Sequence, residues 1–344
     1  MIRSAAFRIL SLSALLTTAL LSLALIAGFF GEVHPAFDSF AHLRVHLAVL
    51  LIFAALPLLL VPPLRLNGFL AAAFGCAAIL TVTGTSLLGL GPVQAAFQPK
   101  DEMSPVYRLM QLNLRFDNPE PNKVLSLIGR VRPDVVTLNE VSAMWAEKLA
   151  LLTSTYPYRV VCTTDNRAGA AAILSLRPFL EGSEGQCLDG GTFATATVDF
   201  GGWPVGIGAL HLHWPWPFDQ AKQIEDIAPL LAGMGQTAIL AGDLNATPWS
   251  AASTLIADAA GMTQVGPAGP TWLYRALPEM LRFAGLPIDR AFAKGDMVVH
   301  SVNTLEAVGS DHLPLLVEFS LKAAHPGVED PQNATVALAV TASR

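Results

Sequence analysis

Hydrophobic residues divide this chain into two parts with different patterns. In the first 91 residues they form three long apolar stretches, at residues 9–30, 46–62 and 68–91. A membrane core about 30 Å thick needs roughly 20 apolar helical residues, and about 17 are enough. Each stretch reaches that length, so the pattern predicts three transmembrane helices.

A cleaved signal peptide is the alternative for the first stretch, because Arg3 and Arg8 precede an apolar core. Two more apolar stretches follow directly, and no Ala-x-Ala-like site separates them, which favours a permanent anchor. Basic residues also predict the orientation. Arg3 and Arg8 precede the first stretch and Arg65 lies between the second and third, so we expect the N-terminus in the cytoplasm. The chain after about residue 92 then lies on the periplasmic or extracellular side of the cytoplasmic membrane.

Shorter apolar runs alternate with helical spacing in the second part of the chain. The expected strands lie at residues 107–114, 134–138, 158–162, 170–175, 192–199, 205–211, 237–241, 297–302 and 313–321. The expected helices lie at 122–131, 142–152 and 218–234 and after Pro248. Strands mixed with helices predict sheets covered by helices.

The same pattern sets the expected domain limits. Residues 92–105 contain three prolines and no hydrophobic period, so we expect a linker there. We expect a catalytic domain over residues 106–322, an irregular segment within it from about 262 to 287, and a disordered tail over residues 323–344.

The charge of the second part is acidic. From residue 100 onward there are 17 basic and 25 acidic residues, a net charge of −8. Proteins that hold duplex DNA through its phosphates usually present a basic face. The composition therefore weighs against a general nucleic-acid binder, although it leaves a local basic groove open.

Three cysteines bear on the compartment. Cys76 falls in the third apolar stretch, whereas Cys162 and Cys187 lie together in the second part. An exported compartment permits a disulfide between these two. The sequence leaves open whether they pair or are unrelated thiols.

Polar residues suited to catalysis lie at or just beyond the ends of expected strands. Six clusters follow one another along the chain: Asn113, Glu140, His211, Asp243 with Asn245, Asp289, and Asp311 with His312. Carboxylate and amide oxygens suit Mg²⁺, which takes one or two protein carboxylates and keeps several waters. In-line attack on phosphorus also needs an activated water and donors to the phosphate oxygens, which the histidines and amides supply. The clusters therefore predict phosphoryl chemistry.

A serine hydrolase is the competing interpretation, because Ser310, Asp311 and His312 are adjacent. Neighbouring residues on an extended chain point to opposite faces, so they cannot form a catalytic triad among themselves. The chain also lacks the Gly-x-Ser-x-Gly elbow that such enzymes use. Both observations argue against acyl transfer.

The order of the six clusters resembles that of the endonuclease/exonuclease/phosphatase superfamily. The resemblance covers roughly residues 106–321 and includes Gly-Asp-Leu-Asn at 242–245 and Ser-Asp-His at 310–312. It implies a four-layer α/β sandwich of two mixed sheets, here preceded by the three transmembrane helices. It departs from the family at residue 115, where an arginine stands in place of the second acid that some nucleases carry.

The resemblance also implies a role for each cluster. Glu140 would bind the metal, with Asn113 beside it and Asp311 completing the shell. His312 would contact the scissile phosphate, with Asp289 as its orienting carboxylate. Asp243 would position or deprotonate the attacking water, and Asn245 would hold that water or a phosphate oxygen. His211 would donate a hydrogen bond to another phosphate oxygen. His213, two residues further on, competes with His211 for its role.

Each of these residues also has a simpler structural explanation taken alone. Glu140 could cap the helix near Ser142, for example, and Asp289 could pair with Arg290. Several tryptophans near the clusters, including Trp214 and Trp216, could stack on a base, meet a lipid surface or simply pack under a loop.

Together these observations predict a membrane-integral hydrolase of a phosphodiester or phosphomonoester that depends on Mg²⁺, with Mn²⁺ able to substitute. Tethering favours a lipid or periplasmic phosphoester, whereas the family resemblance equally admits nucleotides and nucleic acid. No protein partner is implied. A nuclease, or an inactive binding protein with the same fold, are the alternatives.

Overall fold

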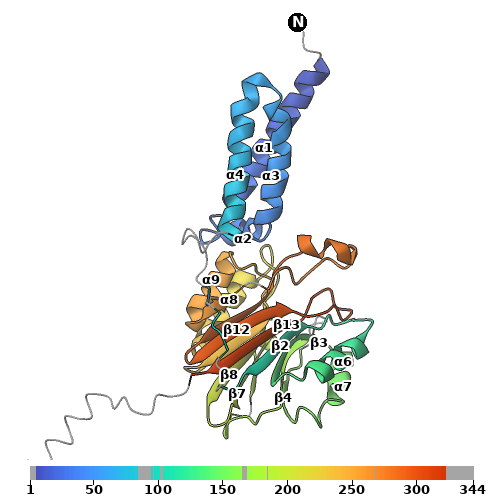
Figure 1. Ribbon diagram of the computed structural model, residues 1–344, viewed down its shortest axis with the longest axis vertical. Helices are drawn as coiled ribbons and strands as arrows, with labels where there is room; N and C mark the ends of the chain where they lie inside the picture. The colour runs from blue at the N-terminus through green and yellow to red at the C-terminus, as the bar shows by residue number, and fades with distance from the viewer. Residues whose placement is uncertain are drawn as a thin grey trace, which may run out of the picture.

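A helical bundle stands on one end of an α/β sandwich (Figure 1). The computed structural model describes residues 5–83, 94–95, 97–100, 104–164, 169–183, 185–266 and 268–322. The predicted disordered tail at 323–344, the end of the third apolar stretch and most of the predicted linker lie outside the described residues.

The bundle contains three long helices joined by short connections. These elements are α1 (Ala5–Ala27), α2 (Pro35–His42), α3 (Arg44–Leu59), the 3₁₀ turn η1 (Pro62–Leu64) and α4 (Arg65–Thr83). Helices α1 and α4 are each long and apolar enough to cross a membrane, whereas α3 reaches that length only together with α2, from which it is bent by 69°. By length and composition, two spans therefore fit, or three if the bent pair counts as one. The second stretch ends before residue 62 because the consecutive prolines Pro62 and Pro63 start η1.

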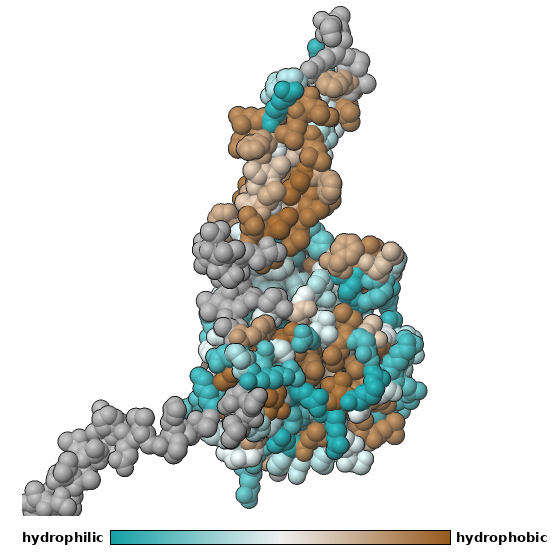
Figure 2. Space-filling view, viewed as in Figure 1, coloured by the Kyte–Doolittle hydropathy of each residue, from teal (hydrophilic) through white to brown (hydrophobic). Residues whose placement is uncertain are grey.

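The N-terminal end of α1 and the sandwich lie at opposite ends of the bundle (Figure 1). Figure 2 shows that the bundle surface is mostly hydrophobic. Side chains such as Leu10, Phe53 and Leu70 are well exposed on it, which is the arrangement that a lipid environment favours.

The sandwich consists of two mixed sheets. One has the strand order β1 (Gln94–Ala95), β10 (Thr263–Val265), β11 (Asp289–Lys294), β9 (Ala238–Asp243), β8 (Pro204–His211), β7 (Phe193–Asp199) and β6 (Gln186–Leu188). The other has the order β12 (Met297–Thr304), β13 (Leu315–Leu321), β2 (Tyr107–Asn113), β3 (Val135–Val141), β5 (Ala170–Ser175) and β4 (Tyr158–Val161). The pairs β2 with β3, β8 with β9 and β1 with β10 are parallel, and the other pairs are antiparallel.

Four layers result from the way the apolar faces are buried. The inner faces of the two sheets pack on each other through residues such as Leu109, Ile173 and Ile207. Helices α8 (Gln220–Ala232) and α9 (Ala251–Ala260) cover the outer face of the seven-stranded sheet. Helices α6 (Pro121–Val131) and α7 (Ala143–Ala150) cover that of the six-stranded sheet. The predicted four-layer α/β sandwich is confirmed.

Four strands were not predicted. Strands β6 and β10 have three residues each, and β1 has two and lies within the predicted linker. Strand β1 pairs with β10, which is far away in the sequence, and β6 pairs with the neighbouring β7, but all three strands are too short to show a hydrophobic pattern. Strand β11 begins with Asp289 and Arg290, both buried, and this charged start hides it from a search for apolar runs.

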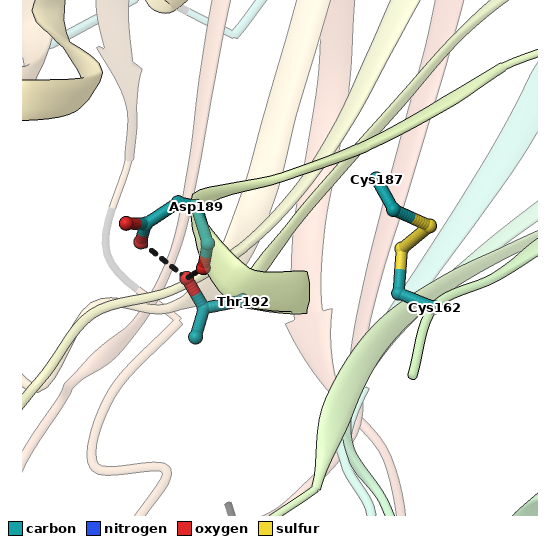
Figure 3. Close-up of a disulfide and its surroundings, with 4 residues drawn as sticks. All are labelled: Cys162, Cys187, Asp189 and Thr192. Carbon is teal, nitrogen blue, oxygen red and sulfur yellow. Dashed lines mark hydrogen bonds between the residues drawn. A yellow bond between two sulfur atoms is a disulfide. The ribbon is translucent and has the colours of Figure 1, made fainter. Parts of the chain in front are cut away.

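A disulfide joins Cys162, which follows β4, to Cys187 in β6 (Figure 3). Because β4 and β6 are edge strands of different sheets, the bond ties the two sheets together along one side. Next to it, Asp189 and Thr192 are hydrogen bonded in the short turn η2 (Asp189–Gly191) that leads into β7. The sequence left open whether Cys162 and Cys187 pair or are unrelated thiols, and the structure shows that they pair.

The bundle and the sandwich meet through α2. The Trp249 indole N–H donates to the carbonyl oxygen of Ala41 at 2.7 Å, and the His42 ring lies 3.4 Å from the Thr247 hydroxyl. Asp38 contacts the first residues of α9. The loop between β9 and α9 therefore rests directly on the helical bundle.

Candidate functional site

A pocket of about 270 Å³ opens at the ends of the central strands of both sheets. Of the residues predicted for the site, six line it: Glu140, His211, Asp243, Asn245, Asp311 and His312. The other two, Asn113 and Asp289, are buried and hydrogen bonded to members of this group. The fold thus brings all eight predicted residues together.

Strand register explains how three of these residues meet. His211 pairs with Asp243 across the parallel β8–β9 ladder, and Asp289 pairs with Asp243 across the antiparallel β9–β11 ladder. Directly paired residues share one face of a sheet. The three side chains therefore point in the same direction from neighbouring strands, although they are far apart in sequence.

His312 lies between two carboxylates at the bottom of the pocket. Its Nδ1 is 2.8 Å from Asp289 Oδ2, and its Nε2 is 3.6 Å from Asp243 Oδ2. Burial alone would lower the pKa of His312, but the negative charges of Asp289 and Asp243 outweigh it and raise that pKa to about 10. The imidazole is therefore protonated near neutral pH, so Nδ1 donates to Asp289 and Nε2 remains a donor facing the pocket.

Asp243 has the properties of a base held in place. Burial raises the pKa of its carboxyl above the ordinary value, although the positive charge of His312 opposes the shift. Asp243 Oδ2 accepts a hydrogen bond from Asn113 Nδ2 at 2.8 Å, and Oδ1 accepts one from the backbone N–H of Asn245 at 2.9 Å. Both oxygens are thus fixed in direction, and Oδ2 also faces the two histidines.

Asn113 joins the two sheets at the site. Its amide nitrogen donates to Glu140 Oε1 at 3.0 Å as well as to Asp243, while its oxygen accepts the backbone N–H of Arg115 at 2.9 Å. The side chain is fully buried and does not line the pocket. In this arrangement Asn113 positions two carboxylates, and the ligand role predicted for it stays a prediction.

His211 and His213 differ in their surroundings. His211 Nε2 lies 3.6 Å from Asp243 Oδ2, whereas His213 is exposed at the pocket wall and its backbone N–H donates to Gln223. His211 is thus the histidine that lies beside the carboxylate, which favours it over His213 for the predicted contact with phosphate.

Comparison with known proteins decides the family. A model of the Endonuclease/Exonuclease/phosphatase family matches residues 110–312, which is more than half of the chain. The chain belongs to this family. Its members are hydrolases that act on phosphoester bonds. No curated protein sequence is similar enough to count as a match.

Solved structures show the same fold at low sequence identity. An endonuclease/exonuclease/phosphatase from Beutenbergia cavernae is 20% identical with a TM-score of 0.50, and the match covers 64% of this chain and 72% of that one. D. rerio TDP2, complexed with a single-strand DNA product, is 18% identical with a TM-score of 0.50, covering 62% and 99%. Staphylococcus aureus beta toxin with bound magnesium ions is 17% identical with a TM-score of 0.48, covering 63% and 100%.

Two groups of side chains in this family member have the chemistry to hold a metal ion. Glu140 and Asp311 line the pocket, and each carboxylate accepts hydrogen bonds from the protein while retaining free lone pairs. Asp243, Asp289 and His312 also converge, with one ligand atom each within 4.8 Å of the others. The second group is already occupied within the protein, because His312 Nδ1 and Asp289 Oδ2 are bound to each other and all three side chains are buried, so the first group is the better candidate. Two carboxylates beside an open pocket fit a hard ion that retains its waters.

Two buried residues whose side chains contact the predicted site residues were not themselves predicted as part of the site. Gln111 Nε2 donates to Asp289 Oδ1 at 3.1 Å, and Asn139 Oδ1 accepts the backbone N–H of Asp243 at 2.9 Å. Gln111 is two residues before Asn113 and thus on the same face of β2. The two-residue spacing between Gln111 and Asn113 could have indicated that Gln111 belongs to the site, because a buried polar side chain on that face of the strand needs a hydrogen-bond partner there.

Proposed function

We propose that this chain is a membrane-anchored phosphoesterase that hydrolyses a phosphodiester or phosphomonoester with the help of a divalent cation, Mg²⁺ or in its place Mn²⁺. The observation that carries the proposal is that His312 lies between the carboxylates of Asp243 and Asp289 at the pocket. The carboxylates of Glu140 and Asp311 line the same pocket. This set provides a base, a positively charged donor and acidic ligands in one place, as attack of water on phosphorus requires.

Glu140 and Asp311 would hold the cation. When bound there, it would supply positive charge to the phosphate oxygens and the leaving oxygen. Trp272 Nε1 lies 3.3 Å from Asp311 Oδ2, and the backbone N–H of Phe116 donates to Glu140 Oε2 at 2.8 Å. These contacts would orient both carboxylates before the substrate arrives.

Asp243 would orient the attacking water and accept its proton. A carboxylate with a raised pKa is a stronger base than an ordinary one, and burial raises the pKa of Asp243. Asn113 would keep the Asp243 carboxylate in this orientation, because the Asn113 amide donates a hydrogen bond to Oδ2. Asn245 lines the pocket two residues later and would hold the water or a phosphate oxygen.

His312 and His211 would act on the phosphate oxygens. The Nδ1 of His312 is bound to Asp289, so the ring is held with Nε2 toward the pocket. Charge that develops on the phosphoryl oxygens during attack would therefore meet a donor that is already oriented, which lowers the barrier. His211, whose Nε2 also lies 3.6 Å from Asp243 Oδ2, would donate to a second phosphate oxygen.

The membrane location is part of the proposal. Two or three helices fit a membrane span, and the Cys162–Cys187 disulfide is typical of an oxidising compartment. The disulfide favours a catalytic domain outside the cytoplasmic membrane. Three spans lead to the same side if the N-terminus lies in the cytoplasm as its basic residues predict, whereas two spans would place the domain inside. An alkaline phosphatase fusion after residue 322 tests this, because the fused enzyme is active only if that end of the chain is exported.

The activity is tested with full-length protein in detergent and bis(p-nitrophenyl) phosphate as a general diester. We expect turnover with Mg²⁺ or Mn²⁺ and none with excess EDTA. Glu140→Ala and His312→Ala should each lower the rate about a hundredfold, the order typical of one catalytic group. Absence of metal-dependent turnover on diester, monoester, lipid and DNA substrates would overturn the proposal.

A further inference from the structure

An apolar flap lies beside the mouth of the pocket. It consists of residues 271–287 and contains the 3₁₀ turn η3 (Glu279–Ala284). Met280 and Phe283 in this turn are 81% and 78% exposed. Large apolar side chains so open to solvent are costly in water unless a partner covers them. Figure 1 shows η3, in orange, near the end of the helical bundle, and Figure 2 shows a hydrophobic cluster over it.

The flap belongs to the site through several contacts. Arg282 donates to the backbone carbonyls of Thr271 and Asp311 at 2.8 and 2.9 Å. Trp272 forms a β-bridge with His312 and lines the pocket. The flap therefore extends from the catalytic residues to the exposed apolar turn.

A second apolar segment lies on the pocket wall. Residues 214–218 follow the strand that carries His211, and Trp214 and Phe218 line the pocket. Trp216 is 51% and Phe218 63% exposed. The Trp214 ring packs edge to face on Trp272 at 5.8 Å, so this segment meets the flap across the mouth.

Both segments are attached to the end of the helical bundle. His46 Nε2, near the start of α3, is 2.7 Å from the carbonyl oxygen of Ala284 in the flap. The Ser39 hydroxyl in α2 donates to the carbonyl oxygen of Trp216 at 3.0 Å. The exposed aromatic and apolar side chains are thus continuous with the helices proposed to span the membrane.

Charge around the mouth does not suit a polyanion. In the described part of the chain, none of the side chains that line the pocket is a lysine or an arginine. The two arginines of the flap have acidic partners: Arg282 pairs with Glu279 at 2.8 Å and Arg275 lies 3.8 Å from Asp117. A protein that follows a nucleic-acid backbone needs a track of available cations.

We propose that the flap and the segment 214–218 insert into the interfacial layer of the bilayer, so that the active site receives phosphoesters carried by membrane lipids. The partner surface is the same bilayer that the helices cross, because both segments touch the bundle end. Met280, Phe283, Trp216 and Phe218 would enter the interface, where aromatic rings are favoured. This inference rests on the proposed phosphoesterase function and names its substrate class.

The test compares two diesters with the same leaving group. Methyl p-nitrophenyl phosphate is free in water, whereas hexadecyl p-nitrophenyl phosphate is carried in phosphatidylcholine vesicles. With full-length protein in those vesicles, we expect kcat/KM to be at least about tenfold higher for the hexadecyl ester, since burial of apolar groups at the interface concentrates it at the mouth. The double substitution Met280→Ser with Phe283→Ser should remove most of that preference and leave the methyl ester rate unchanged.

Leu151→Ser is the matched control, because Leu151 is also a largely exposed apolar residue, at 70%, but follows α7, away from the bundle. It should change neither rate. Equal kcat/KM for the two esters, or faster cleavage of single-stranded DNA than of the hexadecyl ester, would overturn the inference while leaving the phosphoesterase function intact. Failure to cleave either ester, together with failure on the diester, monoester, lipid and DNA substrates named above, would instead remove the function itself.

A second measurement does not depend on activity. In a Cys76→Ser background, Phe283→Cys and Leu151→Cys are each labelled with a nitroxide in phosphatidylcholine nanodiscs. We expect the label at 283 to be more accessible to oxygen than to a water-soluble nickel reagent, and the label at 151 to show the reverse. Aqueous accessibility at both positions would contradict insertion of the flap.

Discussion

The Asp38 carboxylate accepts a hydrogen bond at 2.7 Å from the backbone N–H of Ala251, 213 residues further along the chain. Its second oxygen accepts the N–H of Ala252 at 3.0 Å. These N–H groups belong to the first turn of α9, where a helix has no partners of its own for them and attracts negative charge. A residue of the helical bundle thus completes the start of a helix in the sandwich.

Asp38→Ala should destabilise the join between bundle and sandwich. Loss of a charged, buried cap costs about 1–2 kcal/mol, which for a domain of this size corresponds to a melting temperature roughly 2–8 °C lower. Tryptophan fluorescence during thermal unfolding in detergent measures this. Asp38→Asn, which keeps an acceptor oxygen but not the charge, should fall between Asp38→Ala and the parent. A parent-like melting temperature for Asp38→Ala would show that the contact contributes nothing.

Asp289→Asn should lower kcat about a hundredfold with little change in KM, because the neutral side chain no longer holds His312 as an oriented, protonated donor. The steady-state rate on bis(p-nitrophenyl) phosphate with Mg²⁺ measures the effect. Asp296→Asn is the control: Asp296 lies exposed just beyond the other end of β11 and should leave the rate unchanged. Equal rates for Asp289→Asn and the parent would refute the role of the His312–Asp289 pair.

The site could be predicted from the sequence because its residues end strands in a fixed order. His211 and Asp243 stand at the ends of predicted strands, whereas Asp289 begins β11, which was not predicted, and register brings the three side chains to one face of the sheet. What could not be predicted depends on contacts between distant segments. Strand β1 exists only because it pairs with β10, and no local feature of Asp38 indicates that it caps a helix more than 200 residues later. The pairing of Asp289 with Arg290 that their adjacency allows is likewise settled only in space, since Arg290 donates to Gln264 while Asp289 binds His312.

The Cys162–Cys187 disulfide should contribute mainly to stability. It closes a loop over a separation of 25 residues, which in the chain-entropy model is worth about 3 kcal/mol. The double substitution Cys162→Ser with Cys187→Ser should therefore lower the free energy of unfolding by about that amount. Cys76→Ser, which removes the free thiol in α4, should have no such effect. The parent in reductant should match the double variant, and equal stability with and without reductant would argue against the bond.

Gly242 is required next to Asp243, the proposed base, because a side chain at position 242 has no room. A Cβ at this position would lie 1.8 Å from the carbonyl oxygen of Leu210 in the paired strand β8. Since backbone cannot move aside without breaking the ladder, Gly242→Ala should cost about 3 kcal/mol or more and also shift Asp243.

Gly129→Ala is the matched control for that substitution. Gly129 lies in α6, and no atom comes within 4 Å of a Cβ placed there. Alanine loses less conformational freedom than glycine in a helix, so this variant should be more stable than the parent by roughly 0.5–1 kcal/mol. Chemical unfolding of both variants and diester turnover at the same metal concentration measure the contrast. If Gly242→Ala were as stable and active as Gly129→Ala, close packing of β8 on β9 could not be what holds Asp243 beside His211.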